Sequence, residues 1–176
     1  MKRSIILFFM LFTIVAFSPT ASAYTYQNEP DGFRGIKWGT EFDTVKDQLT
    51  FAYLDDSYGG INVYTKNNDD MSIGSASLES VQYCFWQNKF VMANINVVGI
   101  NNWFGVKDSL KAKFGQGFQS NRYIEDYTWI GNTTIISSKY SEIEKKAKIT
   151  FVSWNSYQQM EAWDAKQAAE GAKKGF

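Results

Sequence analysis

The chain has 176 residues, with 18 basic and 18 acidic side chains, no histidine and one cysteine. The lack of histidine excludes Ser–His and Cys–His catalytic pairs, histidine acid–base chemistry and metal sites built on imidazole. One cysteine cannot form an intramolecular disulfide or a thiolate cluster, and the balanced charge argues against binding to nucleic acid or to an anionic membrane surface.

The first 23 residues have the pattern of a secretory signal peptide. Lys2 and Arg3 supply a basic start, residues 5–17 an apolar centre and residues 21–23 an A-x-A cleavage motif. We predict cleavage between Ala23 and Tyr24, without lipoprotein processing, because no cysteine follows the apolar run. This run is shorter than the roughly 20 residues of a spanning helix, so we expect no stable membrane span after processing. The mature protein is expected to be periplasmic or secreted.

Residues 32–49 predict a short strand followed by a short amphipathic helix. Three glycines bracket Phe33–Trp38, which favours a strand with tight turns beside it. Thr40 is a candidate N-cap, and Asp43 is placed to complete a capping box. The hydrophobic residues behind the cap recur at helical spacing and would form one apolar stripe: Phe42, Val45 and Leu49.

Two residues of this opening segment have alternative interpretations. Arg34 could bind an anion, because its planar guanidinium suits carboxylates and phosphates, but a structural ion pair or a solvated side chain is favoured. Trp38 could stack on a ligand, but a tryptophan beside a glycine more often fills a core. We expect the structural alternative in both cases.

The middle of the chain predicts short strands separated by turns. Phe51–Leu54 is short and apolar, and turn-forming residues follow it. Ile61–Thr65 is a candidate strand, and Met71–Ser75 is expected to pair with it.

Leu78–Val98 predicts a β-hairpin with its turn at Gln87–Asn88. This register pairs Phe85 with Phe90, and Tyr83 with Met92, on the face that also holds Val81. The opposite face is apolar too, with Cys84, Val91, Ala93 and Ile95. Either both faces are covered, or one stays open for a partner. Cys84 is expected to be a small buried side chain rather than a redox site.

A second helix and a second group of strands complete the pattern. Asn101 or Asn102 is expected to cap the helix and Gly115 to end it, with an apolar stripe of Trp103, Val106, Leu110 and Phe114 between them. Strands are expected at residues 123–130 and 133–140, joined by a two-residue turn at Gly131–Asn132. A last strand at residues 147–154 and a C-terminal helix at residues 156–172 follow.

This order of elements predicts an α+β fold. We expect residues 24–176 to form a single α+β domain built from two degenerate helix-plus-antiparallel-strand units, at roughly 32–98 and 101–155. The two units share a pattern, since F-x-x-V-x-x-x-L at residues 42–49 matches W-x-x-V-x-x-x-L at residues 103–110. The helices of both units are expected to share one core.

The opening FRGIKWGT at residues 33–40 resembles the start of the mature domain in a family of small, uncharacterised exported bacterial proteins, which has the motif F-R-G-[IV]-x-W-G. The hairpin YCFWQNKFVMANI, the helix WFGVKDSLKAKFG and the closing ITFVSWNSYQQMEAW extend the resemblance over most of the mature chain. These motifs are structural, and the family implies no known activity. The alternation of helix and antiparallel strands is also loosely similar to BamE-like and β-lactamase-inhibitor-like domains, at the level of the fold alone.

The remaining catalytic chemistry is that of carboxylates. Glycosidases use two carboxyl groups about 5–10 Å apart, and the adjacent pairs are Asp55–Asp56, Asp69–Asp70 and Glu125–Asp126. Neighbouring side chains on an extended chain point to opposite sides, so we expect solvated turn residues instead. The NNDD run at residues 67–70 lacks the spacing of a calcium loop, and we predict no metal site and no cofactor.

We therefore expect a non-enzymatic, exported binding or assembly-factor domain that uses an aromatic-rich sheet face near residues 81–95. Its partner would be an envelope protein or a small ligand. The alternative is a carboxylate-dependent hydrolase of envelope glycans, which needs two carboxyl groups in a cleft beside aromatic side chains.

Overall fold

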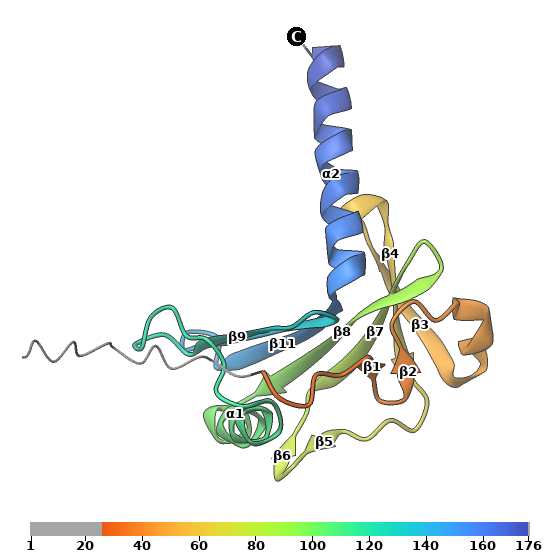
Figure 1. The fold of residues 1–176 in the computed structure, drawn as a ribbon. Helices are drawn as coiled ribbons and strands as arrows, with labels where there is room; N and C mark the ends of the chain where they lie inside the picture. Colours follow the sequence, from red (N-terminus) through yellow and green to blue (C-terminus); the bar gives the residue numbers. More distant parts are fainter. Residues whose placement is uncertain (1–25, 176) are drawn as a thin grey trace, which may run out of the picture.

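The computed structural model describes residues 26–175, and the predicted signal peptide with its Ala23–Tyr24 cleavage site lies outside them. A seven-stranded antiparallel sheet forms the centre of the molecule (Figure 1). Its strands, in spatial order, are β3 (Leu49–Asp55), β4 (Ile61–Lys66), β7 (Ser80–Trp86), β8 (Lys89–Val98), β11 (Lys146–Ser153), β10 (Thr134–Ser141) and β9 (Asp126–Ile130). With helices α1 (Ile100–Phe114) and α2 (Trp154–Gly175), the predicted α+β class is confirmed.

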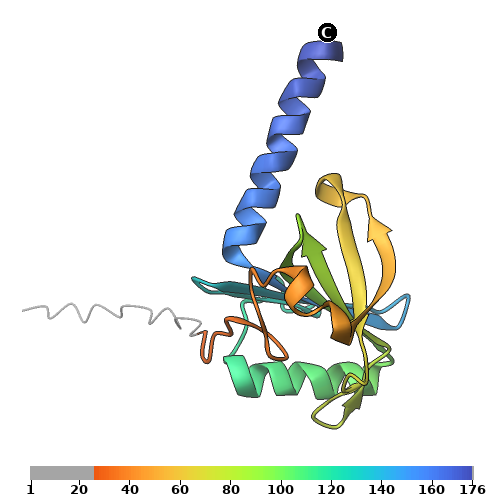
Figure 2. The same cartoon turned by 90° about the vertical axis from the view of Figure 1, so that its right-hand side faces the viewer.

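Helix α1 covers one face of the sheet (Figure 2). Its predicted stripe is confirmed, because Trp103, Val106, Leu110 and Phe114 are all buried. They pack in the main core cluster with aromatic and aliphatic residues of the strands, including Tyr83, Phe85, Phe90, Ile95, Ile136 and Ile149. The face toward α1 is therefore the aromatic-rich face of the sheet.

Of the two predicted ends of α1, the C-terminal cap is confirmed and the N-terminal cap is wrong. Gly115 ends the helix with a φ of 84°, and its N–H donates to the carbonyl of Lys111. The predicted asparagine cap is wrong, since the N-cap is Gly99, whose φ of 88° turns the chain out of β8. Asn102 instead joins two elements, because its amide nitrogen donates to Val98 O and its amide oxygen accepts from Ser77 N–H.

The predicted first helix is wrong. The segment forms two 3-10 turns, η1 (Phe42–Thr44) and η2 (Lys46–Gln48), and neither has a side-chain cap. Backbone hydrogen bonds explain the difference: Phe90 N–H donates to Thr40 O, and Phe42 N–H donates to Asn88 O, so the start of the segment is tied to the β7–β8 hairpin. Strand β3 already begins at Leu49, which leaves too few residues for a stable α-helix. The stripe still faces the core, with Phe42 and Val45 partly buried and Leu49 buried.

The predicted strand at Phe33–Trp38 is a miniature hairpin of β1 (Gly32–Phe33) and β2 (Ile36–Lys37). Arg34 and Gly35 form its turn, with φ values of 46° and 84°. Phe33 and Ile36 pack into the main core cluster, on the same face of the sheet as α1. A second small hairpin, β5 (Ser72–Ile73) with β6 (Ala76–Ser77), replaces the predicted pairing of Met71–Ser75 with the strand at residue 61.

The β7–β8 hairpin confirms the turn at Gln87–Asn88 and the pairing of Phe85 with Phe90. The predicted pairing of Tyr83 with Met92 is wrong, because Tyr83 lies opposite Ala93. A β-bulge causes the shift, since Val91 is an extra residue on β8 that has no pairing partner on β7. Ala93 and Ile95 consequently face the main core and not the side of Cys84 and Val91.

The turn after β9 also differs from the prediction. Ile130 pairs with Ile135, and three residues, 131–133, connect β9 to β10 where two were predicted. The carboxylate of Glu29 accepts hydrogen bonds from the N–H groups of Thr133 and Thr134, at 2.5 and 2.8 Å. This contact with a distant segment holds the wider loop open, which a local turn rule cannot anticipate.

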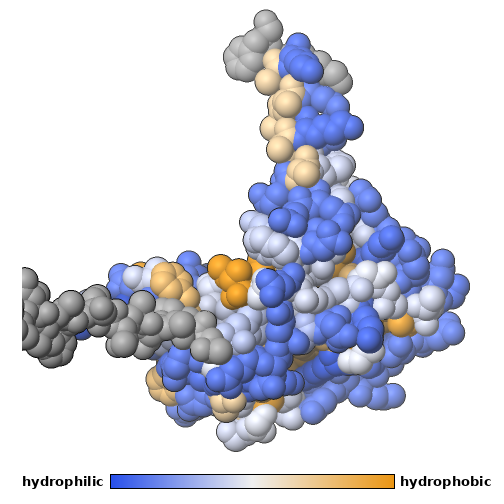
Figure 3. Space-filling model, viewed as in Figure 1, coloured by the Kyte–Doolittle hydropathy of each residue, from blue (hydrophilic) through white to orange (hydrophobic). Residues whose placement is uncertain are grey.

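The second face of the sheet carries a smaller core cluster of Ile61, Val63, Cys84, Trp86, Val91, Val152 and Met160. The first turns of α2 cover it, and Trp163 packs against Gly59 of the 3-10 turn η3 (Ser57–Gly59). Beyond Trp163, α2 extends away from the body of the molecule (Figure 1 and Figure 3), and residues 164–173 are exposed. Neither helix of the described chain has the length and hydrophobicity that a membrane crossing requires.

Candidate functional site

The aromatic side chains of the β7–β8 hairpin are core residues. Tyr83, Phe85 and Phe90 are buried under α1 and the β1–β2 hairpin, and Trp86 on the other face donates its indole N–H to Tyr58 O. The rest of that other face is mixed: Lys139 of β10 and Lys148 of β11 lie directly opposite each other and are exposed, whereas Met92 and Ile135 are partly buried against the second core cluster. Most of the exposed hydrophobic side chains of the sheet lie on a different strand.

They gather on β3, the edge strand at the end of the sheet (Figure 1). Phe51 is 56% exposed, Tyr53 44% and Leu54 54%. Between Leu49 and Leu54 the strand has no charged residue and no proline. In the described chain β3 pairs with β4 on one side only, so its other side offers unpaired backbone N–H and C=O groups.

The three exposed side chains lie on both faces of the edge. Phe51 lies opposite Tyr64 and contacts it edge to face, with ring centroids 5.6 Å apart. A bulge between Phe51 and Tyr53 reverses the alternation, and the Tyr53 hydroxyl donates to the side-chain oxygen of Gln82 at 3.5 Å. A strand added at this edge would thus meet hydrophobic side chains above and below its own backbone.

An aromatic chain connects this edge to the core. Tyr64 stacks on Phe42 with ring centroids 4.6 Å apart, and contacts Phe85 at 5.5 Å. Phe42 also contacts Phe85, at 5.4 Å. Because Phe85 is buried, the exposed ring of Phe51 rests on a fixed support and requires little ordering when a partner binds.

The opposite edge strand, β9, is bridged by the segment that follows α1. The backbone of Phe118 bridges to Thr128 of β9 with two hydrogen bonds, at 2.7 and 2.9 Å. Gly117 allows this approach, because a Cβ atom there would lie 2.7 Å from the ring of Trp129. Ile130 is the exposed hydrophobic residue at the end of this strand.

Arg34 forms the structural ion pair that the sequence favoured. Its guanidinium lies 2.8 Å from the buried carboxylate of Asp69 and donates to the carbonyls of Asp70 and Ser72. Asp69 also accepts from the Tyr83 hydroxyl at 2.9 Å. Burial, and then the charge of Asp69, hold the pKa of Tyr83 above its ordinary value. These bonds fasten the β1–β2 turn to the loop before β5.

Trp38 and Cys84 also have structural surroundings. Trp38 stacks on Phe90 with ring centroids 5.0 Å apart, and its indole N–H donates to the Thr134 hydroxyl at 2.7 Å. Cys84 is buried in the second core cluster, as expected, and burial raises the pKa of its thiol to about 12. A thiol held neutral in this way is a poor nucleophile.

The predicted carboxylate pairs have separate structural partners. Asp55 accepts from Ser57 N–H, and Asp70 from Ser72 N–H. Glu125 lies 2.8 Å from Lys107, and also accepts from the indole of Trp103. Burial opposes the charge of Glu125, but the contacts with Lys107, Trp103 and Lys111 together outweigh it and lower the pKa of Glu125. Within residues 26–175, no three acidic or cysteine side chains gather closely enough to hold a metal ion.

No family model, no curated protein and no solved structure matches this chain. The function proposed for this chain therefore rests on the geometry of the described residues. The sequence signal for the β3 edge is the uncharged run TFAYL at residues 50–54.

Proposed function

We propose that this chain is a non-enzymatic binding domain that receives an extended segment of a partner polypeptide along β3. The predicted export signal would place the partner in the cell envelope. The observation that carries the proposal is an edge strand that is uncharged over residues 49–54 and has three half-exposed hydrophobic side chains, whereas the other edge of the sheet is bridged by Phe118.

Proteins normally protect an edge strand with lysine, proline, a covering loop or a very short strand, because the unpaired backbone attracts other strands. Strand β3 is seven residues long, and its protective features are one bulge and the charged Asp55 at its end. Strand addition combines backbone hydrogen bonds, which supply affinity, with side-chain contacts, which supply specificity. The chemistry of β3 favours an uncharged partner segment with hydrophobic side chains on both faces.

The expected affinity is modest. Full burial of a large hydrophobic side chain contributes about 1.5–3 kcal/mol, and these three are already about half buried. Backbone hydrogen bonds add about 0.5–1.5 kcal/mol each. The cost of association, about 4–15 kcal/mol, cancels much of this gain, so binding along β3 alone should be reversible, as suits an assembly factor.

The alternative of a carboxylate-dependent glycan hydrolase draws less support from the described residues. Asp69 and Glu125, which accept hydrogen bonds from Tyr83 and Trp103, are engaged by Arg34 and Lys107. Neither has a second carboxylate among the partners that it contacts.

Site-specific photo-crosslinking in native envelopes tests the proposal. A benzophenone amino acid is placed at Phe51 or Leu54 and, as controls, at Ile130 or Ile143, which are 64% and 95% exposed. We expect a crosslinked partner polypeptide from positions 51 and 54 and little from positions 130 and 143. Equal crosslinking at all four positions, or none, would contradict the proposal, and a product of twice the chain's own mass would identify a second copy instead of a separate partner.

Matched lysine variants provide the second arm. Leu54→Lys places a protective charge on the β3 edge, and Ile130→Lys places the same charge on β9. Lysine is a side chain that natural edge strands use to prevent pairing. We expect Leu54→Lys to lose most of the crosslink at position 51 and Ile130→Lys to retain it.

A further inference from the structure

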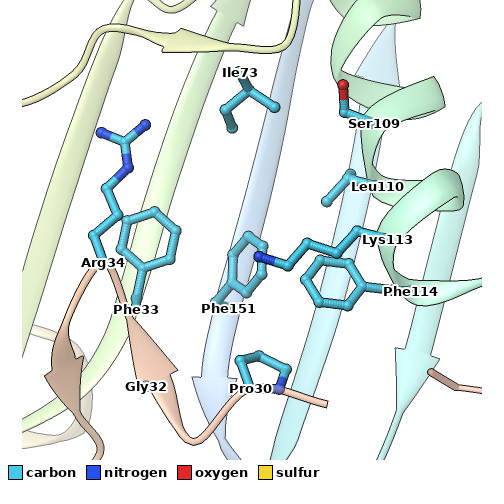
Figure 4. Close-up of a pocket in the computed structure, with 10 residues that line it drawn as sticks. All are labelled: Pro30, Gly32, Phe33, Arg34, Ile73, Ser109, Leu110, Lys113, Phe114 and Phe151. Atoms are coloured by element: carbon cyan, nitrogen blue, oxygen red, sulfur yellow. The ribbon is translucent and has the colours of Figure 1, made fainter. Parts of the chain in front are cut away.

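A cavity of about 270 Å³ lies between the β1–β2 hairpin and α1, on the aromatic-rich face of the sheet (Figure 4). Five hydrophobic side chains form most of its wall: Phe33, Ile73, Leu110, Phe114 and Phe151. An apolar cavity of about 150 Å³ holds one benzene molecule, so this one has room for a ring and a short side chain, or for a short acyl chain.

The walls of the cavity are already in place. Phe151 of β11 contacts Phe33 with ring centroids 5.2 Å apart and Phe114 with ring centroids 6.0 Å apart. All three rings belong to the main core cluster. The ion pair of Arg34 with Asp69 fixes the β1–β2 turn at the mouth of the cavity. A ligand would therefore enter a preformed site at little conformational cost.

The charges around the mouth select for an anion. Arg34 is satisfied by Asp69, but Lys113 makes no ion pair or hydrogen bond through its ammonium group to any residue in the 26–175 range. Figure 4 shows the Lys113 side chain reaching from α1 across the cavity toward Phe151. No acidic residue lines the cavity, and the Ser109 hydroxyl already donates to Gly105 O. The Lys113 ammonium lies over the ring of Phe114, 5.5 Å from its centroid. The cavity thus combines an apolar interior with one positive charge that no carboxylate of the described chain neutralises.

We propose that this cavity binds a small amphipathic carboxylate, either an aryl- or a short acyl-carboxylate. Its apolar body lies among Phe33, Phe114 and Phe151, and its carboxylate pairs with the ammonium group of Lys113. Lys113 is exposed, so water screens the pair in part, and the preference for a carboxylate is expected to be modest. This site is separate from the β3 edge and does not depend on the function proposed for that edge.

Calorimetric titration with two probes tests the inference. 3-Phenylpropionate carries the charge, and 3-phenylpropionamide is its neutral counterpart of nearly equal shape. We expect the wild-type chain to bind the acid about 5- to 20-fold more tightly than the amide, on the scale of one charge-assisted contact. Methyl resonances of Ile73 and Leu110 should shift on binding, which locates the ligand.

Two lysine variants on one helix separate local pairing from general charge attraction. Lys113→Gln should remove the preference for the acid and leave the affinity for the amide unchanged. Lys111→Gln removes the same charge from α1, but this lysine lies over the ring of Tyr127 and does not line the cavity. It should keep the preference.

Three results would overturn the inference. The first is equal affinity of the wild-type chain for acid and amide, and the second is a preference that survives in Lys113→Gln. The third is no saturable binding of either probe below about 10 mM, which is weaker than the range in which small ligands normally bind. Because Lys113 is exposed, its substitution should leave the fold intact, and unchanged thermal unfolding would verify this.

Discussion

The two edges of the sheet differ in what covers them. At β9, the backbone of Phe118 forms an isolated bridge of two hydrogen bonds with Thr128, and Tyr127 and Trp129 are buried in the core. At β3, the outer backbone has no such neighbour in the described chain, and Phe51, Tyr53 and Leu54 face solvent. One sheet therefore has one edge closed by its own chain and one edge open.

The position of α1 explains the difference. Trp103 of α1 stacks on Tyr140 of β10, with ring centroids 6.0 Å apart, so the helix lies over the half of the sheet that ends in β9. Strand β3 lies away from α1, and its exposed Phe51 packs on Tyr64, which in turn stacks on Phe42. This arrangement separates two tasks, because the covered half stabilises the fold while the open edge remains free to bind.

The largest expected difference between these halves is in stability. Ile149→Ala on β11 removes fully buried side-chain atoms and should lower the free energy of unfolding by about 2–5 kcal/mol. Phe51→Ala on β3 should lower it by less than about 1 kcal/mol, because its ring is half exposed. Denaturant unfolding measures both variants. Similar losses would show that β3 is part of the stability core and would break the comparison.

The next effect would turn the closed edge into an open one. Gly117→Ala places a Cβ atom against the Trp129 ring. This should lower the free energy of unfolding by about 1–3 kcal/mol and displace the backbone of Phe118 from β9. The amide of Thr128, which donates to Phe118 O, should then exchange its hydrogen faster. Gly171→Ala is the control, since no atom lies near it. Unchanged exchange at Thr128 would mean that the cover does not depend on Gly117.

A third measurement tests whether water reaches the second core cluster, which contains Cys84. Cys84 lies on β7, two strands in from β3, and burial raises its pKa from 9.0 to about 12. A thiol whose folded-state pKa is raised stabilises the fold fully below pH 9 and loses that contribution as pH rises from 9 to 12. Stability should fall by about 1 kcal/mol between pH 8 and pH 10 from this group, and Cys84→Ala should show a smaller fall. An equal fall in both would indicate that water reaches Cys84.

The smallest expected effect is on the stability of the two edge variants. Leu54→Lys and Ile130→Lys both change exposed side chains, and each should alter the free energy of unfolding by less than about 0.5 kcal/mol. Thermal unfolding at equal protein concentration tests this. A much larger loss in Leu54→Lys would mean that its effect on partner binding reflects unfolding of β3.

Helix α1 and the β7–β8 turn could be predicted, because each depends on the spacing of residues close together in the sequence. The 3.6-residue recurrence of Trp103, Val106, Leu110 and Phe114 identified α1, and the polar pair Gln87–Asn88 located the hairpin turn. The segment after Gly39 was not predictable in this way. Its local pattern favours a helix, but Thr40 bonds to Phe90 across 50 residues of sequence and fixes an extended start.

The candidate site was even less predictable, although residues 51–54 were recognised as short and apolar. Whether a strand is an edge depends on the order of all seven strands, which no single window of sequence contains. Likewise, the cavity beside Lys113 needs Phe33 and Phe151, which are more than 100 residues apart. Local patterns therefore identified several elements, while the exposed edge and the cavity arise only from their assembly.

The additional valine in β8 also sets a rule for how this chain can change. Up to Phe90 the strand follows one alternation of inward and outward side chains, and from Met92 onward it follows the other. Replacing Val91 with another small hydrophobic residue preserves both alternations. Removing it would force one of the two to invert, so insertions and deletions at this position should be far more damaging to the protein than substitutions.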